Sequence, residues 1–171
     1  MFTRILVPTD FSESSDAALD YARALADKFG ASLRLLHVIE PPYESGAFSN
    51  EVYLAETPGL YDMLVKKAQA QFASRVFPGD RARYGITTEI MTGHSATTIV
   101  EYAADQHFDL IVMGTHGRTG LAHLFMGSVA EHVVRKALCP VLTVRQAPAA
   151  PVATVSRSDR TSRFDTAPGP G

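Results

Sequence analysis

Five short apolar segments alternate with segments that have the periodicity of amphipathic helices, and this alternation strongly restricts the possible folds. The apolar segments, typical of strands, are residues 3–9, 31–40, 85–91, 108–114 and 139–145. The helix-like segments are residues 11–30, 60–76, 95–107 and 128–138. Parallel strands joined by helices need crossovers of one hand. The order therefore predicts an α/β fold: a single doubly wound domain with a five-stranded parallel sheet and helices on both faces.

Local sequence signals predict where several helices begin and end. Ser12 is a favourable N-cap for the first helix, and Gly30 is a favourable residue to end it. The predicted core-facing stripe of this helix consists of Ala18, Tyr21, Ala22, Leu25, Ala26 and Phe29. Pro78-Gly79 is predicted to end the second helix. Thr98 and Glu101 have the spacing of a capping box in the third helix.

The composition is that of an ordinary globular protein, with 46% hydrophobic residues and a net charge of −2. This charge gives no electrostatic reason to expect a nucleic acid or an anionic membrane as partner. No apolar run approaches the roughly 20 residues of a membrane helix, and the opening segment does not resemble a signal peptide. One cysteine, Cys139, excludes an internal disulfide. We therefore expect a cytoplasmic protein.

The composition changes after residue 145. Residues 146–171 are rich in proline, alanine and serine and contain few large apolar residues. Such a segment buries too little apolar surface to order itself, so we expect a folded domain at residues 1–145 followed by a disordered tail. Residues 41–58 form a predicted loop of unusual length, which is typical of functional or mobile segments.

The segment GTHGRTGLAHLFMGS, residues 114–128, joins the fourth predicted strand to the fourth predicted helix. Gly114 and Gly117 follow the strand directly, and Gly127 precedes Ser128 at the helix start. Helix N-termini carry unpaired N–H groups and partial positive charge, which bind phosphate. The glycine order is neither that of a P-loop nor that of the dinucleotide-binding fingerprint. The segment therefore predicts a polyphosphate site of another kind.

Three distant pieces of the sequence are predicted to meet at one edge of the sheet. Residues 8–10, 37–38 and 114–117 all follow or end predicted strands. Ligands of open α/β sheets bind beyond the carboxyl ends of the strands, where the strand order reverses. We therefore expect these segments to share one ligand.

The motif G-x2-G-x9-G-[ST] resembles the ATP-binding signature of the universal stress protein family. The segments RILVPTDFSESSDAAL, LLHVIE and CPVLTVR also resemble that family, so the similarity covers roughly residues 1–145. The resemblance implies an ATP-binding regulator of the stress response, or a nucleotide sensor. It also implies homodimers that pair through the last strand, Pro140–Val144. An exposed apolar edge strand needs a cover, and a second copy supplies one.

Eleven residues are candidates for nucleotide binding: Pro8, Thr9, Asp10, Val38, Met113, Gly114, Gly117, Arg118, Gly127, Ser128 and Val129. The resemblance implies that Asp10 bonds the ribose hydroxyls and that the backbone of Val38 reads the adenine edge. It implies that Pro8 and Thr9 line the base pocket, while the glycines and Ser128 hold the phosphates. Arg118 is a further candidate for contact with the γ-phosphate.

No metal site built from side chains is predicted, because the six histidines show neither H-x3-H nor H-E-x-x-H spacing. ATP is the expected ligand, alone or with Mg²⁺ or Mn²⁺ held mainly by the phosphates. No catalytic residue is assigned, because residues 114–128 contain no lysine, acid or amide side chain. Two alternatives stay open: an enzyme that slowly hydrolyses ATP or transfers a phosphoryl or adenylyl group, and a scaffold without nucleotide. A protein partner of unknown identity is also open.

Overall fold

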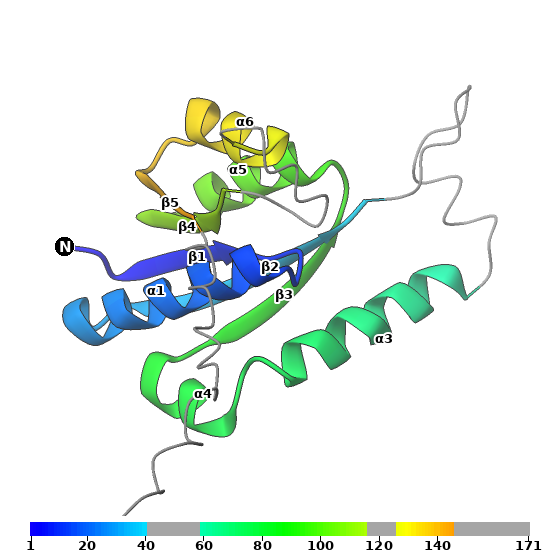
Figure 1. Ribbon diagram of the computed structural model, residues 1–171, viewed down its shortest axis with the longest axis horizontal. Helices are drawn as coiled ribbons and strands as arrows, with labels where there is room; N and C mark the ends of the chain where they lie inside the picture. Colours follow the sequence, from blue (N-terminus) through cyan, green and yellow to red (C-terminus); the bar gives the residue numbers. More distant parts are fainter. Residues whose placement is uncertain (41–58, 116–125, 146–171) are drawn as a thin grey trace, which may run out of the picture.

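The computed structural model describes residues 1–40, 59–115 and 126–145 of the chain (Figure 1). The elements are β1 (Arg4–Pro8), α1 (Glu13–Phe29), β2 (Ser32–Ile39), α3 (Leu60–Ala73), α4 (Pro78–Tyr84), β3 (Thr87–Thr92), α5 (Ser95–Asp105), β4 (Leu110–Gly114), α6 (Ser128–Lys136) and β5 (Val141–Val144). The loop 41–58 and the tail 146–171 expected from the sequence lie outside the described residues. Within the described residues, no helix is long and apolar enough to cross a membrane.

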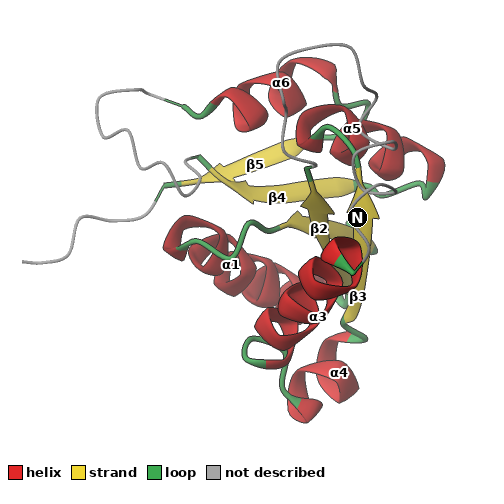
Figure 2. Ribbon diagram, turned by 90° about the vertical axis from the view of Figure 1, so that its right-hand side faces the viewer, coloured by secondary structure: helices red, strands yellow, loops and turns green. Residues whose placement is uncertain are grey.

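The five strands form one parallel sheet in the order β3-β2-β1-β4-β5. Helices α5 and α6 cover one face, while α1 and α3 lie on the other (Figure 2). Alternate residues of β1 enter the two layers: Ile5 and Val7 pack with α1, and Leu6 packs with α5 and α6. All three side chains are fully buried. The expected α/β architecture with helices on both faces is confirmed.

The predicted ends of α1 are confirmed, but one member of its predicted core stripe is wrong. The Ser12 hydroxyl accepts a hydrogen bond from the Ser15 N–H at 3.3 Å, and Gly30 ends the helix with φ of 69°. Tyr21 is 58% exposed, and Leu19 is buried instead. The buried face includes Ser14, Ser15, Ala18, Ala22 and Ala26. These small side chains let the helix pack close to the sheet.

Two other predicted helix signals are wrong. Pro78-Gly79 opens the short helix α4 rather than only ending α3, because proline suits the first position of a helix. Helix α5 begins at Ser95, before the expected Thr98–Glu101 box, and it has no side-chain cap hydrogen bond. Instead, the Ser95 N–H donates to Glu40 Oε1 at 2.6 Å. A carboxylate distant in sequence therefore takes the place of a local cap.

The middle of the sheet opens at the carboxyl ends of its strands. The β1–β4 ladder contains only the pairs Ile5–Leu110 and Leu6–Ile111. On the other side of β1, the Thr9 N–H donates to the Leu36 carbonyl at 2.8 Å, one residue beyond the last β1–β2 pair. Strands β2 and β3 lie on one side of β1, and β4 and β5 lie on the other. The opening therefore lies at the topological switch point, where the strand order changes direction.

Candidate functional site

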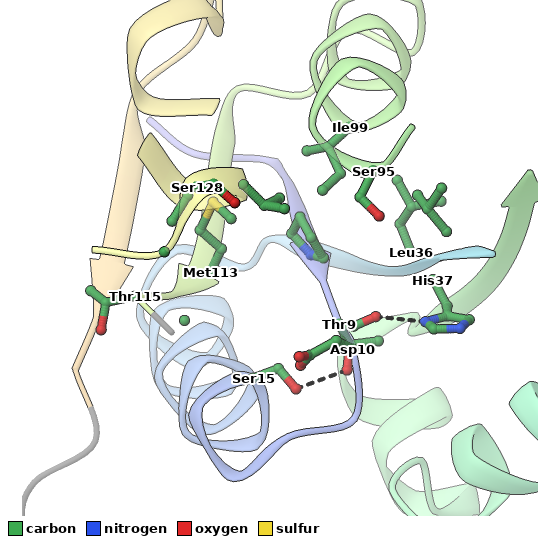
Figure 3. A pocket seen from close by; sticks show the side chains of 16 residues that line it. Thr9, Asp10, Ser15, Leu36, His37, Ser95, Ile99, Met113, Thr115 and Ser128 are labelled. Atoms are coloured by element: carbon green, nitrogen blue, oxygen red, sulfur yellow. Dashed lines mark hydrogen bonds between the residues drawn. The ribbon is translucent and has the colours of Figure 1, made fainter. Parts of the chain in front are cut away.

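A cavity of about 200 Å³ occupies this opening (Figure 3). Its lining comes from the ends of β1, β2 and β4 and from the first turns of α1, α5 and α6. Figure 3 shows Ser128 and Met113 on one side, and Ile99, Ser95 and Leu36 on another. The side chains of Thr9, Asp10 and Ser15 lie opposite them. The sheet edge therefore brings polar and apolar groups around one space.

Most of the candidate residues line this cavity. They are Pro8, Thr9, Asp10, Val38, Met113, Gly114, Gly127, Ser128 and Val129. The remaining two, Gly117 and Arg118, lie outside the described residues. The structure therefore brings together residues from three distant parts of the sequence.

Seven lining residues were not among the eleven candidates, although two of them, His37 and Thr115, lie in segments expected to share the ligand: Ser15, Leu36, His37, Ser95, Ile99, Thr115 and Ala130. Leu36, His37 and Thr115 adjoin predicted site residues on their strands, so proximity along the strand was an available signal. Ser95 opens α5, and Ile99 lies one helical turn later on the same face. Their membership depends on how α5 packs over the sheet, which no local pattern specifies.

The β1–α1 turn is fixed by a chain of hydrogen bonds at the polar side of the cavity. The Ser15 hydroxyl donates to the Ser12 carbonyl at 2.8 Å and lies 3.0 Å from the Thr9 hydroxyl. Because the Ser15 proton is already used, the Thr9 hydroxyl donates to Ser15 and accepts from the Phe11 N–H at 3.0 Å. Thr9 and Ser15 are both buried. The turn therefore has a defined conformation beside the cavity.

Asp10 and His37 extend this network. Asp10 Oδ1 accepts from the Ser12 N–H at 3.1 Å and from the Ser12 hydroxyl at 2.6 Å, which orients the carboxylate. His37 Nδ1 lies 2.8 Å from the Thr9 carbonyl, so this nitrogen carries a proton and donates (Figure 3). A negatively charged oxygen acceptor is thereby held at the cavity between the strand ends and α1.

The other side of the cavity is largely apolar. Leu36, Val38, Ile99 and Met113 are all buried and belong to one cluster that continues into the core. Ser95 adds a hydroxyl at the start of α5 (Figure 3). This side has the character of a site for a flat apolar ring with a polar edge.

The backbone of Val38 faces the cavity. Each residue of a parallel strand points its N–H and its carbonyl to the same neighbouring strand. Successive residues alternate between the two neighbouring strands. The Leu36 carbonyl bonds β1, and the Ile39 carbonyl accepts from Gly93 on the β3 side. Val38 therefore directs its N–H and carbonyl to the β1 side, beyond the last β1–β2 hydrogen bond among the described residues. A donor and an acceptor stand next to each other at the apolar wall.

The N-terminus of α6 points its first turn at the cavity. Gly127 is the N-cap, and the first intrahelical bond runs from the Glu131 N–H to the Gly127 carbonyl. The N–H groups of residues 128–130 have no acceptor within the helix, and this end carries partial positive charge. The Gly127 N–H itself donates to the Thr115 carbonyl at 2.7 Å. The N–H groups suited to an anion are therefore those of Ser128 to Ala130, not that of Gly127.

Gly114 has a packing role that the sequence did not indicate. A Cβ at this position would lie 2.4 Å from Ser14 Oγ and 2.9 Å from the Ser14 carbonyl carbon and oxygen. The end of β4 thus approaches the first turn of α1 too closely for any side chain. Ser14 Oγ is buried there without a hydrogen-bond partner among the described residues. The glycine at 114 is explained by this contact whether or not an anion binds.

Among the described residues, no group of three or more histidine, cysteine, aspartate or glutamate side chains is arranged to hold a metal ion. The part of the cavity lining that the structure describes contains no lysine or arginine. The charged and dipolar groups of the described site include the Asp10 carboxylate and the N-terminus of α6. This set suits a neutral diol and an anion better than a metal held by side chains.

The sequence pattern of the universal stress protein family matches residues 1–145, and the chain belongs to that family. Universal stress protein MJ0531 of Methanocaldococcus jannaschii is 33% identical over 150 residues, which cover 85% of this chain and 84% of that protein. The solved structure of MJ0577, from the same organism, has a TM-score of 0.71 and 31% identity, covering 86% of this chain and 98% of that one. A universal stress protein solved in complex with cAMP has a TM-score of 0.52 and 24% identity, covering 84% and 96%, and shares the fold.

Proposed function

We propose that this protein binds ATP in the cavity and acts as a nucleotide-responsive regulator. The observation that carries the proposal is the arrangement around one space of three unlike groups: an apolar wall with the Val38 backbone, the Asp10 carboxylate and the α6 N-terminus. These groups correspond in chemistry to a base, a ribose and a phosphate chain. The cAMP complex of a protein with the same fold is in keeping with a nucleotide as the class of ligand.

The adenine ring would occupy the apolar side between Ile99, Met113 and Leu36. The N–H and carbonyl of Val38 offer a donor and an acceptor side by side, which match the adjacent acceptor and donor on the adenine edge. Guanine presents a different pattern at the corresponding atoms, so the same backbone groups would oppose it. A site that hydrogen-bonds its ligand in this way discriminates strongly against mismatched analogues.

The ribose would lie at Asp10. A carboxylate has several lone pairs and accepts hydrogen bonds from both hydroxyls of a vicinal diol. The bonds from Ser12 to Asp10 Oδ1 keep the carboxylate oriented before the ligand arrives. This orientation reduces the ordering cost of binding.

The phosphates would meet the N–H groups of residues 128–130 and the Ser128 hydroxyl, where the helix dipole favours negative charge. Gly117 and Arg118 remain candidates for the same ligand. A divalent cation, Mg²⁺ or Mn²⁺, would enter with the phosphates as its main ligands, because the described residues offer no metal cluster. The chain's own contribution is therefore to bind and orient the phosphates.

Binding, rather than rapid turnover, is the function these groups favour. Phosphoryl transfer needs cations or donors placed at the reacting phosphate and a group that orients the attacking water. The described lining supplies no lysine or arginine. ATP would instead link β2, the β1–α1 turn and α6, and so shift the population of conformations that a partner protein recognises. We place this activity in the cytoplasm and in a homodimer paired through β5.

The test uses the freshly purified full-length chain. Native mass spectrometry and calorimetric titration with ATP, GTP and adenosine would measure occupancy and affinity, followed by a timed assay for ADP. We expect micromolar or tighter ATP binding, weaker GTP binding and negligible ADP formation. Asp10→Asn should weaken ATP binding, and Asp105→Asn, at the exposed end of α5, is the matched control. Rapid ADP formation would favour the alternative of an ATP-hydrolysing enzyme, and no nucleotide binding would favour the alternative of a scaffold without nucleotide.

A further inference from the structure

Phe11 adopts an uncommon backbone conformation next to Asp10. Its φ is 65°, in the left-handed region that non-glycine residues with bulky side chains seldom occupy. It stands between Asp10 and the N-cap Ser12, within the turn that presents the carboxylate to the cavity. Such a conformation persists only when surrounding contacts hold it.

Arg75, which follows α3, supplies several of those contacts. Its Nη2 donates to the Phe11 carbonyl at 3.0 Å, and its guanidinium carbon lies 5.3 Å from the centre of the Phe11 ring. The same ring packs edge-on against the Phe72 ring, with 5.2 Å between the ring centroids, and its centroid lies 4.5 Å from that of the His37 ring. These contacts hold both the backbone and the side chain of Phe11, and they come from the same side of the sheet.

Arg75 is itself rigidly held. Its Nε donates to Asp16 Oδ1 at 2.5 Å, and Nη2 donates to Asp16 Oδ2 at 3.1 Å, a bidentate pair with α1. Its Nη1 donates to Gln71 Oε1 at 2.7 Å. The side chain is only 19% exposed. Every nitrogen of the guanidinium is thus used, and a flexible ammonium could not reproduce this geometry.

The contact reaches Asp10 through the backbone. The Phe11 N–H donates to the Thr9 hydroxyl, so the residues on both sides of Asp10 are linked by one hydrogen bond. Asp10 Oδ1 then accepts from Ser12, the residue after Phe11. Displacement of Phe11 would shift both the peptide that carries Asp10 and the groups that orient its carboxylate.

We propose that Arg75 is a positioning residue for ribose recognition: it lies outside the cavity lining and holds Phe11 so that Asp10 faces a vicinal diol. This inference rests on the proposed function, in which Asp10 accepts hydrogen bonds from the ribose. It makes a residue just after α3, outside the cavity lining, a determinant of selectivity for ribonucleotides. Arg75 reaches the cavity through Phe11 and the β1–α1 turn, so its loss should affect the sugar contact more than the base and phosphate contacts.

The experiment compares the affinity for ATP with that for 2′,3′-dideoxy-ATP, which lacks the diol, using calorimetry on the full-length chain. The wild-type protein should prefer ATP by about tenfold or more, as expected for hydrogen bonds to a carboxylate. Arg75→Met should remove most of this preference, while affinity for the dideoxy analogue changes by no more than about twofold. Arg83→Met is the matched control. Arg83 also pairs with an aspartate and lies 5.3 Å from an aromatic ring, Tyr84, but it does not contact the turn.

The possible outcomes distinguish a failure of the role proposed for Arg75 from a failure of the proposed function. Equal loss of both ligands in Arg75→Met, or an unchanged preference, would overturn the positioning role. A preference retained in Asp10→Asn would overturn the ribose contact itself, and with it this inference. Loss of the preference in Asp10→Asn but not in Arg75→Met would leave the proposed function intact and remove only the role of Arg75. If Arg75→Met does not fold, Arg75→Lys decides by the same ratio, because lysine lacks the bidentate geometry.

Discussion

Ser14 at the start of α1 lies against Gly114 at the end of β4, so closely that a Cβ on Gly114 would fall 2.4 Å from Ser14 Oγ. Backbone atoms of Ser14 lie within 2.9 Å of the same point, so a change of rotamer at Ser14 would not relieve the clash. This contact joins the first turn of α1 to the strand that precedes the glycine-rich segment. It therefore fixes one wall of the cavity.

Gly114→Ala should destabilise the protein by about 1–3 kcal/mol, the usual cost of forcing atoms into a packed site. Urea denaturation measures the effect. Gly79→Ala is the matched control, because no atom of the described residues lies within 4 Å of a Cβ at that position. Residue 79 is in helix α4, so the control should be neutral or slightly stabilising. Equal stability of the two variants would show that α1 yields readily at Ser14.

Ser128→Pro should weaken ATP binding more than Ser128→Ala. Alanine removes only the hydroxyl, whereas proline also removes the N–H at the first position of α6. The helix should tolerate proline there, because Gly127 is extended, with φ of −70° and ψ of 152°. A hydrogen bond to a charged group is worth about 1.5–3 kcal/mol, so the additional loss should be roughly tenfold or more. Titrations with ATP and adenosine check this: the adenosine affinity of both variants should match the wild type.

Thr143→Pro should convert the proposed homodimer to monomer. The Pro140 and Val144 carbonyls accept hydrogen bonds from β4, so alternation directs the N–H of Thr143 outward along the sheet edge. Proline removes that N–H without removing a β4–β5 bond. Light scattering after gel filtration measures the mass. Thr143→Val retains the N–H and should remain dimeric; a dimer in both variants would place the interface elsewhere.

Because of Asp109, the free energy of unfolding should fall at acidic pH. Burial raises the pKa of this carboxyl, but hydrogen bonds from the Thr3 N–H, the Thr3 hydroxyl and the Arg4 N–H outweigh it, and the pKa lies below its ordinary value. The folded state therefore binds the proton less readily than the unfolded chain does. The resulting stability is fully present above the unfolded pKa of about 3.9 and is lost as pH falls through the folded pKa.

Urea denaturation of the wild type and of Asp109→Asn between about pH 7 and pH 3 checks this expectation. Asp109→Asn should have a lower free energy of unfolding than the wild type at neutral pH. This difference, the stability gap, should narrow only below about pH 4. A gap that stays constant through pH 3 would show that the carboxylate's charge makes no contribution.

Much of the fold was predictable from sequence because its signals are local. The apolar runs and helical stripes specified the order of elements apart from the short helix α4, and Ser12 and Gly30 specified the ends of α1. The position of the cavity at this edge of the sheet was predictable for a related reason. In a parallel sheet, carboxyl ends meet at one edge, so Asp10, Val38 and Gly114 had to approach one another.

Other features arise only when elements pack. Tyr21 fits a helical stripe, but it is 58% exposed in the folded chain and Leu19 is buried instead. The Gly127 N–H is used by the Thr115 carbonyl, which shifts the suitable anion donors to residues 128–130. Arg75 contacts Phe11, 64 residues earlier in the chain. The sequence by itself determined the layers and the edge at which the site forms, since periodicity and chain order suffice for both. Only the tertiary structure decided which amides remain for an anion and what holds Asp10, since those depend on distances between segments far apart in the chain.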